Sequence, residues 1–292
     1  MASRTPIYDA LASLGPASVP RSLVIWDPPA TPLSTMTSAF AAIATYLAVL
    51  YGGSTIMKGR QPFGSSLKFP FLVHNIALTI GSGLLLAVML EEIIPILRHG
   101  GFFYGICHEA AWTSRLETFY IINYYFKYWE LIDTVFLVLK KKPLQFLHVY
   151  HHSATALLCF SQLHGKTSVS WFVIVLNLAV HVVMYMYYAA STLRLRLPWK
   201  KAVTILQISQ FFGAIGVCVF AAYSHWSSKW GLSRHGGCAG KEYAAVAGVV
   251  CLTSYLFLFL GFYAKTYKND GKKGGKKVVA NGSAANGHAK KR

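Results

Sequence analysis

Long apolar runs alternate with short polar segments over most of this chain. Each run is about as long as a helix that crosses the hydrocarbon core of a bilayer, which needs about 20 residues. We therefore predict seven membrane-spanning helices, at about 37–57, 70–97, 115–139, 144–164, 168–190, 200–225 and 242–264. Together they form a predicted membrane domain over 37–264.

The two ends of the chain lack this pattern. Residues 1–36 are rich in Pro, Ser and Ala, so we expect a mostly irregular N-terminal segment. Residues 265–292 are rich in Lys, Gly and Asn and almost free of apolar side chains, so we expect a disordered basic tail.

The composition supports a membrane protein. Of the 292 residues, 54% are hydrophobic and only 13% are charged, whereas soluble domains carry about 25% charged residues. The fold class is therefore all-α and integral to the membrane. The net charge of +18 is compatible with nucleic acid binding, but the basic residues lie between and after the apolar runs. That placement favours lipid headgroups or a phosphorylated substrate, and we expect no nucleic acid partner.

The distribution of Lys and Arg predicts the orientation. Most of them lie in the tail and in the loops after the first, third and fifth spans, so we place these parts in the cytosol and the N-terminus in the lumen. Cys107 and Cys238 then fall in two lumenal loops, in an oxidising compartment, and we predict a disulfide between them. Cys159, Cys218 and Cys251 lie within spans and are expected to pack as small apolar residues.

Three histidines in the fourth span are the strongest chemical signal. His148, His151 and His152 stand at i, i+3 and i+4, which places their side chains on one face of a helix. Polar side chains inside a membrane are costly, so such a cluster indicates a functional site. The alternative is a set of core histidines that neighbouring groups satisfy.

Three other spans carry polar stripes at helical spacing. The residues are Lys127, Glu130, Asp133 and Thr134 in the third span, Asn177, His181, Tyr185 and Tyr188 in the fifth, and Thr204, Gln207 and Gln210 in the sixth. We predict that all of them face one cavity with the histidines, and that Glu130 or Asp133 orients a histidine ring. A structural ion pair, an interfacial tyrosine belt and hydrogen bonds between helices remain as alternatives.

Basic residues flank the predicted cavity on its cytosolic side and suit a ligand with phosphates. They are Lys140, Lys141, Lys142, Arg194, Arg196, Lys200 and Lys201. An apolar tunnel below them would suit a lipid tail. Together these features predict an acyl-CoA, with its thioester held at the histidines.

Two chemistries fit a histidine-rich membrane site. Imidazole suits iron, but a di-iron site needs many ligands, and the 11 histidines supply only one compact cluster. A neutral imidazole can instead attack the thioester and carry the acyl group, which needs a partner for its tautomer and donors for the oxyanion. We favour this covalent route, with no metal and no cofactor.

Four segments resemble the ELO family of fatty-acid elongases. They are KYWELIDT at 127–134, HVYHH at 148–152, NLAVHVVMYMYY at 177–188 and TILQISQ at 204–210, in family order, and the resemblance covers about 60–265. The stretch HVYHHSATALLCFSQL is similar to fungal members that act on saturated and monounsaturated chains.

The resemblance implies a barrel formed by spans two to seven around an acyl tunnel. It implies condensation of acyl-CoA with malonyl-CoA to 3-ketoacyl-CoA, CO₂ and CoA. His151 would be the nucleophile, His181 the second catalytic imidazole, and His148 and His152 would hold the geometry. The alternatives are an iron-dependent desaturase or hydroxylase and a lipid transporter without enzyme activity.

The resemblance also implies a cellular setting. We expect the endoplasmic reticulum membrane, a part in sphingolipid biosynthesis, and the other enzymes of the elongation cycle as partners, and we leave a homodimer open. Asn281 begins an N-x-S sequon in the predicted cytosolic tail, so it should carry no glycan.

Overall fold

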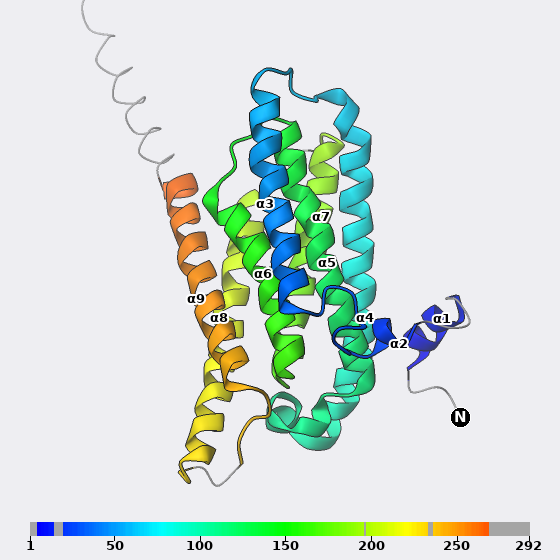
Figure 1. Cartoon of the computed structure of the whole chain (residues 1–292), viewed down its shortest axis with the longest axis vertical. Helices are drawn as coiled ribbons and strands as arrows, with labels where there is room; N and C mark the ends of the chain where they lie inside the picture. Colours follow the sequence, from blue (N-terminus) through cyan, green and yellow to red (C-terminus); the bar gives the residue numbers. More distant parts are fainter. Residues whose placement is uncertain (1–4, 15–19, 196, 233–235, 269–292) are drawn as a thin grey trace, which may run out of the picture.

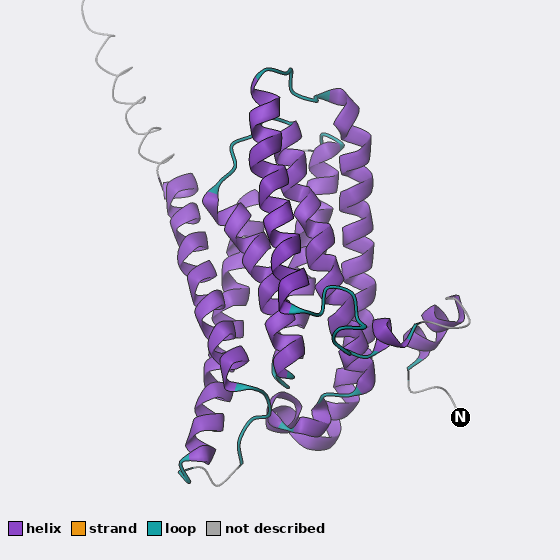
Figure 2. Cartoon of the chain, in the orientation of Figure 1, coloured by secondary structure: helices purple, strands orange, loops and turns teal. Residues whose placement is uncertain are grey.

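The computed structural model describes residues 5–14, 20–195, 197–232 and 236–268, and every regular element in them is helical (Figure 2). The α-helices are α1 (Pro6–Leu14), α2 (Arg21–Val24), α3 (Met36–Lys58), α4 (Lys68–Cys107), α5 (Ser114–Leu139), α6 (Phe146–Gly165), α7 (Ser170–Thr192), α8 (Lys200–Lys229) and α9 (Glu242–Tyr263). Short 3₁₀ turns precede α4 and α5, at Ser65–Leu67 and Glu109–Ala111, and a π-helical turn, Ala264–Lys268, follows α9.

The long helices α3 to α9 coincide with the seven apolar runs. Their bounds differ from the predicted ones by a few residues, except that α4 continues to Cys107 instead of ending at about 97. The chain bends at Gly101, which has a φ of 76°, and then resumes helical geometry. Glycine adopts this left-handed region without the steric cost of a Cβ.

Within the described residues, five segments are long and apolar enough to cross a membrane. They are Met36–Lys58, Ser65–Cys107, Ser170–Thr192, Lys200–Lys229 and Glu242–Tyr267. The helices α5 and α6 fall outside this group because they carry the polar stripe and the histidine cluster. They lie among the other long helices (Figure 1), and their crossing of the membrane stays a prediction.

The long helices run side by side along the long axis of the molecule (Figure 1). Following the contacts, α4 packs on α5, α5 on α6, α6 on α9, α9 on α8, α8 on α7, and α7 again on α4. The first long helix, α3, packs on α5 and α6. The core of the protein therefore lies among α4 to α9.

Loops close one end of this group of helices. A disulfide joins Cys107, the last residue of α4, to Cys238 in the connection between α8 and α9. Beside it, the Ala239 N–H donates to the Cys107 carbonyl at 2.8 Å. Gly240 has a φ of 128°, and a Cβ there would lie 2.8 Å from Thr167, so the connection can approach the α6–α7 turn only as glycine.

The N-terminal segment, predicted to be mostly irregular, contains two short helices, α1 and α2. Two carboxylates of the long helices fasten this segment. Glu91 of α4 accepts from the Tyr8 N–H at 2.9 Å. Glu117 of α5 accepts from the Trp26 N–H at 2.8 Å and from the Trp112 indole at 2.6 Å.

Candidate active site

The helix α6 places the three histidines close together. The rings of His148 and His152 lie 4.5 Å apart, and the His151 ring meets the edge of Tyr255 on α9 at 4.7 Å. Among the described residues, His148 Nε2 and His151 Nδ1 are buried and have no hydrogen-bond partner. An unpaired buried nitrogen is costly, so a polar ligand group at these two nitrogens would be stabilising.

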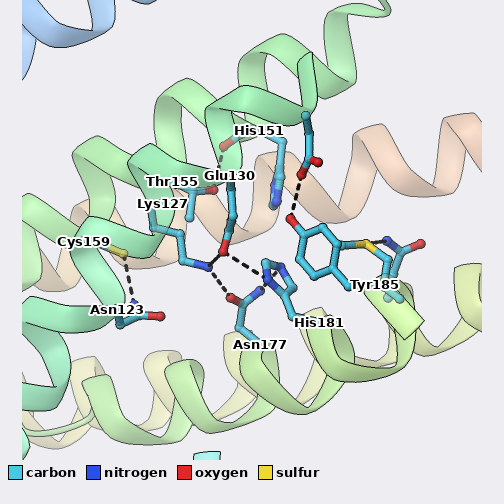
Figure 3. Close-up of polar contacts among 12 residues, drawn as sticks. Asn123, Lys127, Glu130, His151, Thr155, Cys159, Asn177, His181 and Tyr185 are labelled. Carbon is cyan, nitrogen blue, oxygen red and sulfur yellow. Dashed lines mark hydrogen bonds and ion pairs between the residues drawn. The ribbon is translucent and has the colours of Figure 1, made fainter. Parts of the chain in front are cut away.

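A buried network joins α5 to α7 beside this cluster. Lys127 Nζ donates to Glu130 Oε1 at 2.7 Å and to Asn177 Oδ1 at 2.8 Å (Figure 3). Glu130 Oε1 also lies 3.2 Å from His181 Nδ1, and Asn177 Nδ2 lies 3.2 Å from His181 Nε2. With the Asn177 amide donating to Nε2, a neutral His181 ring carries its proton on Nδ1, which lies near the Glu130 carboxylate without the geometry of a hydrogen bond. An ammonium has three N–H donors, so Lys127 keeps one that these two acceptors do not use.

Asp133 belongs to a second network, on three helices. Its Oδ1 lies 2.9 Å from Nε2 of His74 on α4, and its Oδ2 accepts from the hydroxyl of Tyr185 on α7 at 2.7 Å. Sequence reasoning placed His74 among the scattered histidines and missed this contact. The available signal was the polar pair His74 and Asn75 inside the apolar run of the second span. Asp133 therefore orients a histidine outside the cluster of three.

Thr134 faces away from these groups. Its hydroxyl accepts from the Tyr46 hydroxyl of α3 at 2.8 Å. The polar residues predicted on α5 therefore face two sides of the helix. Lys127, Glu130 and Asp133 contact α4 and α7, whereas Thr134 contacts α3.

An apolar cavity lies among α5 to α9. Lys127, His151, Asn177 and Gln210 supply polar groups to its lining, which otherwise consists mainly of apolar side chains such as Leu158, Val173, Ile174, Phe211, Ala214 and Leu252. Gln162, Ser170 and Trp112 also line it, and they lie near the end that the disulfide closes. The lining suits an apolar ligand whose reactive group lies at the polar side chains.

Only one of the three polar residues predicted on the sixth span lines the cavity. Gln210 reaches the cavity, and its Oε1 is buried without a partner among the described residues. Thr204 instead bonds the Lys200 carbonyl at 3.2 Å, and Gln207 Nε2 lies 3.2 Å from the Met184 sulfur. For Thr204 and Gln207, bonding within and between helices accounts for the polar side chain.

A second hollow, of about 420 Å³, lies at the other end of α5 and α7. Its lining includes three basic residues, Lys68, Lys140 and Arg194, together with Tyr188 and Phe71. Lys140 Nζ lies 3.4 Å from the centre of the Phe71 ring. Burial, with a smaller contribution from the charge of Lys142, lowers the pKa of Lys140. Sequence reasoning had not included Lys68.

The other predicted phosphate ligands are dispersed. Lys141 donates to the carbonyls of Lys58 and Arg60 at 3.3 and 3.1 Å. Lys142, Lys200 and Lys201 are exposed near this end of the helices, and Arg196 lies outside the described residues.

A column of polar side chains lies between the cavity and the basic hollow. Along α5 it contains Lys127, Glu130, Asp133 and Lys140, and along α7 it contains Asn177, His181, Tyr185 and Tyr188. The first residue of each row lines the cavity and the last lines the hollow. In order along the helices, the structure therefore presents an apolar cavity, a set of packed polar side chains and a basic hollow. Within the described residues, no group of three or more His, Cys, Asp or Glu side chains is arranged to hold a metal ion.

Comparison with known proteins agrees with the family resemblance. The model of the ELO: GNS1/SUR4 family matches residues 31–275. A protein of Schizosaccharomyces pombe named putative fatty acid elongase 1 is 46% identical over 255 residues, which are 87% of this chain and 76% of the relative. Putative fatty acid elongase 2 of the same yeast is 45% identical over 78% of this chain and 62% of the relative. Very long chain fatty acid elongase 6 of Drosophila melanogaster is 31% identical over 87% of this chain and 79% of the relative.

Proposed function

Since the chain belongs to the ELO (GNS1/SUR4) family and is similar to proteins named fatty acid elongases, we propose that it condenses an acyl-CoA with malonyl-CoA. The products are a 3-ketoacyl-CoA that is two carbons longer, CO₂ and CoA, and we propose saturated or monounsaturated chains as substrates. One observation carries the proposal. His151 lines an apolar cavity together with Lys127, the residue through which the buried network of Glu130, Asn177 and His181 reaches that cavity.

In this proposal all seven long helices cross the membrane, and α4 to α9 form a barrel. The order in which they pack supports it, because each contacts two neighbours and the series returns to its start. The cavity inside is then the acyl tunnel. The proposal places the closed end of this tunnel toward the Cys107–Cys238 disulfide and its entrance on the side of the basic hollow.

The first half-reaction is acyl transfer to His151. The buried ring has an unpartnered nitrogen, and a neutral imidazole is nucleophilic. Attack forms a bond between an imidazole nitrogen and the thioester carbon, and the carbon–sulfur bond then breaks to release CoA. The unused N–H of Lys127 and the Gln210 amide border the same cavity and can stabilise the oxyanion. His148 and His152 hold the His151 ring in place.

The second half-reaction needs decarboxylation of malonyl-CoA and attack on the acyl group. We assign support of this step to His181, whose proton position Glu130 and Asn177 define. The enolate formed by loss of CO₂ attacks the acyl carbon on His151. The pair of electrons in the carbon–nitrogen bond returns to the imidazole.

The basic hollow would receive the CoA phosphates, at Lys68, Lys140 and Arg194, because ammonium and guanidinium groups match phosphate oxygens. The hollow then faces the cytosol and the disulfide faces the lumen of the endoplasmic reticulum. This orientation leaves the C-terminal tail cytosolic, with Asn281 unglycosylated.

The test uses the purified full chain with labelled acyl-CoA, first alone and then with malonyl-CoA. The wild-type protein should form an acyl adduct, and malonyl-CoA should convert it to 3-ketoacyl-CoA. His151→Ala should lose both, a fall of several orders of magnitude, whereas His99→Ala, at an exposed position of α4, should lose neither. An adduct that survives His151→Ala would show that another residue is the nucleophile. Activity that requires about two Fe per chain would instead favour the iron enzyme.

A further inference from the structure

The proposed reaction consumes a proton that must reach a buried site. Malonyl-CoA loses a carboxylate as neutral CO₂, and the CoA released from the acyl donor leaves as a thiol. The sum is acyl-CoA plus malonyl-CoA plus H⁺, giving 3-ketoacyl-CoA, CO₂ and CoA. One proton therefore enters from water in every turnover.

The balance of each half-reaction shows where that proton is needed. In the first, neutral His151 attacks with one nitrogen, and the proton on its ring passes to the departing thiolate. In the second, the bond between nitrogen and the acyl carbon breaks, and its electron pair leaves the ring as an imidazolate. The ring must then be protonated again, so the requirement falls in the second half-reaction, at His151.

We infer that His74, Asp133 and Tyr185 form the relay that brings this proton from the basic hollow to the reacting histidines. The inference rests on the proposed function. The three side chains come from α4, α5 and α7, and they are in hydrogen-bond contact in series: His74 Nε2 to Asp133 Oδ1 at 2.9 Å, and Tyr185 OH to Asp133 Oδ2 at 2.7 Å.

The outer end of the series lies near the basic hollow. His74 is one turn from Phe71, a rise of about 4.5 Å along α4, and Phe71 lines that hollow. The His74 and Phe71 rings both contact Phe136.

The inner end lies at the reacting histidines. The ring centres of Tyr185 and His181 lie 5.4 Å apart. Asn177, which contacts His181 Nε2 at 3.2 Å, lines the same cavity as His151. Figure 3 shows the side chains of His151, His181 and Tyr185 converging from α6 and α7. No other described side chain hydrogen-bonds to either oxygen of Asp133.

Several titratable groups surround the relay and bear on its pH dependence. Tyr46 on α3, His148 on α6 and Tyr188 on α7 interact electrostatically with Asp133. Glu130 and Lys140 flank it on α5 itself. All of them remain unchanged in the variants below, so a changed pH profile reports on the relay.

The test compares wild-type protein with His74→Gln and Tyr185→Phe, each as the full chain. A glutamine amide can still donate to Asp133 but cannot carry a proton onward, and phenylalanine keeps the ring that packs on His181. Acyl-adduct formation without malonyl-CoA should stay within about twofold of wild type, and kcat for condensation should fall by about tenfold or more. The KM values for both substrates should change little.

Two further measurements separate proton supply from packing. In the variants kcat should rise as the pH falls, by about tenfold per unit, because protons then arrive directly from water, and added imidazole should restore activity. The kcat of the double variant His74→Gln/Tyr185→Phe should be no lower than that of the slower single variant, because both residues act in the same proton path. His164→Gln is the matched control, because His164 is also held by a tyrosine hydroxyl, that of Tyr243 at 2.9 Å, but lies far along α6.

The outcomes are distinct. Equal loss of adduct formation and condensation, or a fall in kcat with an unchanged pH profile and no imidazole rescue, would overturn the relay. Unchanged condensation in both variants would overturn it as well. If His74→Gln does not fold, Tyr185→Phe decides the question by the same measurements. A wild-type protein that forms no acyl adduct would refute the proposed function, independently of these variants.

Discussion

Lys127 Nζ and Glu130 Oε1 lie 2.7 Å apart, one turn along α5, and their side chains are only 2% and 4% exposed. The charges are neutralised inside the protein, and each group has a further partner: Asn177 for the ammonium and His181 for the carboxylate. The same pair therefore fixes α5 against α7 and sets the electrostatic environment of His181. The stability and the chemistry of the site depend on it in different ways, which mutation can separate.

Lys127→Met should destabilise the protein by about 3–5 kcal/mol, because it leaves the Glu130 carboxylate buried without its cation. The double variant Lys127→Met/Glu130→Gln should recover most of that loss, since no unpaired charge remains. Unfolding free energies in detergent measure both. Condensation should stay low in the double variant, because the donor at the cavity is gone. A single variant as stable as wild type would contradict the pairing.

His181→Ala should separate the two half-reactions. His151 and the cavity lining around it stay in place, so the acyl adduct should form at nearly the wild-type level. Conversion of the adduct by malonyl-CoA should slow by about 10²–10⁴-fold, the range typical of acid–base groups. Single-turnover measurement of the adduct, before and after malonyl-CoA, reports both. Loss of the adduct itself would place His181 in the first half-reaction.

Lys140→Ala and Arg194→Ala should weaken substrate binding without changing the chemical step. We expect KM for acyl-CoA to rise about 3–10-fold with kcat nearly constant, as for the loss of one charge-assisted phosphate contact. An acyl-pantetheine, which lacks the nucleotide and every phosphate of CoA, should be used equally well by variants and wild type. Lys229→Ala is the control, because Lys229 pairs with Glu242 at the disulfide end. Equal effects on both substrates would argue against a nucleotide site.

Thiol labelling tests the disulfide and the orientation together. The unfolded, unreduced protein should react at three cysteines, namely Cys159, Cys218 and Cys251, and reduction should add Cys107 and Cys238. The bond links residues 131 apart in sequence, so in the chain-entropy model it contributes about 5 kcal/mol at most. Cys238→Ser should lower stability and leave the residues of the cavity unchanged. Labelling of all five before reduction would rule out the bond and weaken the lumenal assignment.

The elements of this fold were predictable because apolar length and helical periodicity are local properties of the sequence. The pairing of Lys127 with Glu130 was equally accessible, since both lie on one helix at i, i+3. The contact between Asp133 and His74 could not be predicted, because the two residues are 59 apart in sequence and their proximity depends on which helices pack together. The same limit applies to Gln207, whose contact with Met184 depends on the rotation of α8 against α7.

Because α5 carries both networks, the protein should tolerate a change of chain length there less than elsewhere. A single residue inserted between Lys127 and Asp133 would turn everything beyond it by about 100° around the helix axis. The Asn177 contact and the His74 contact could not then be made at once. Surface loops absorb insertions at small cost, so variation in length among related chains should collect in the loops and the termini, and this part of α5 should keep its residue count.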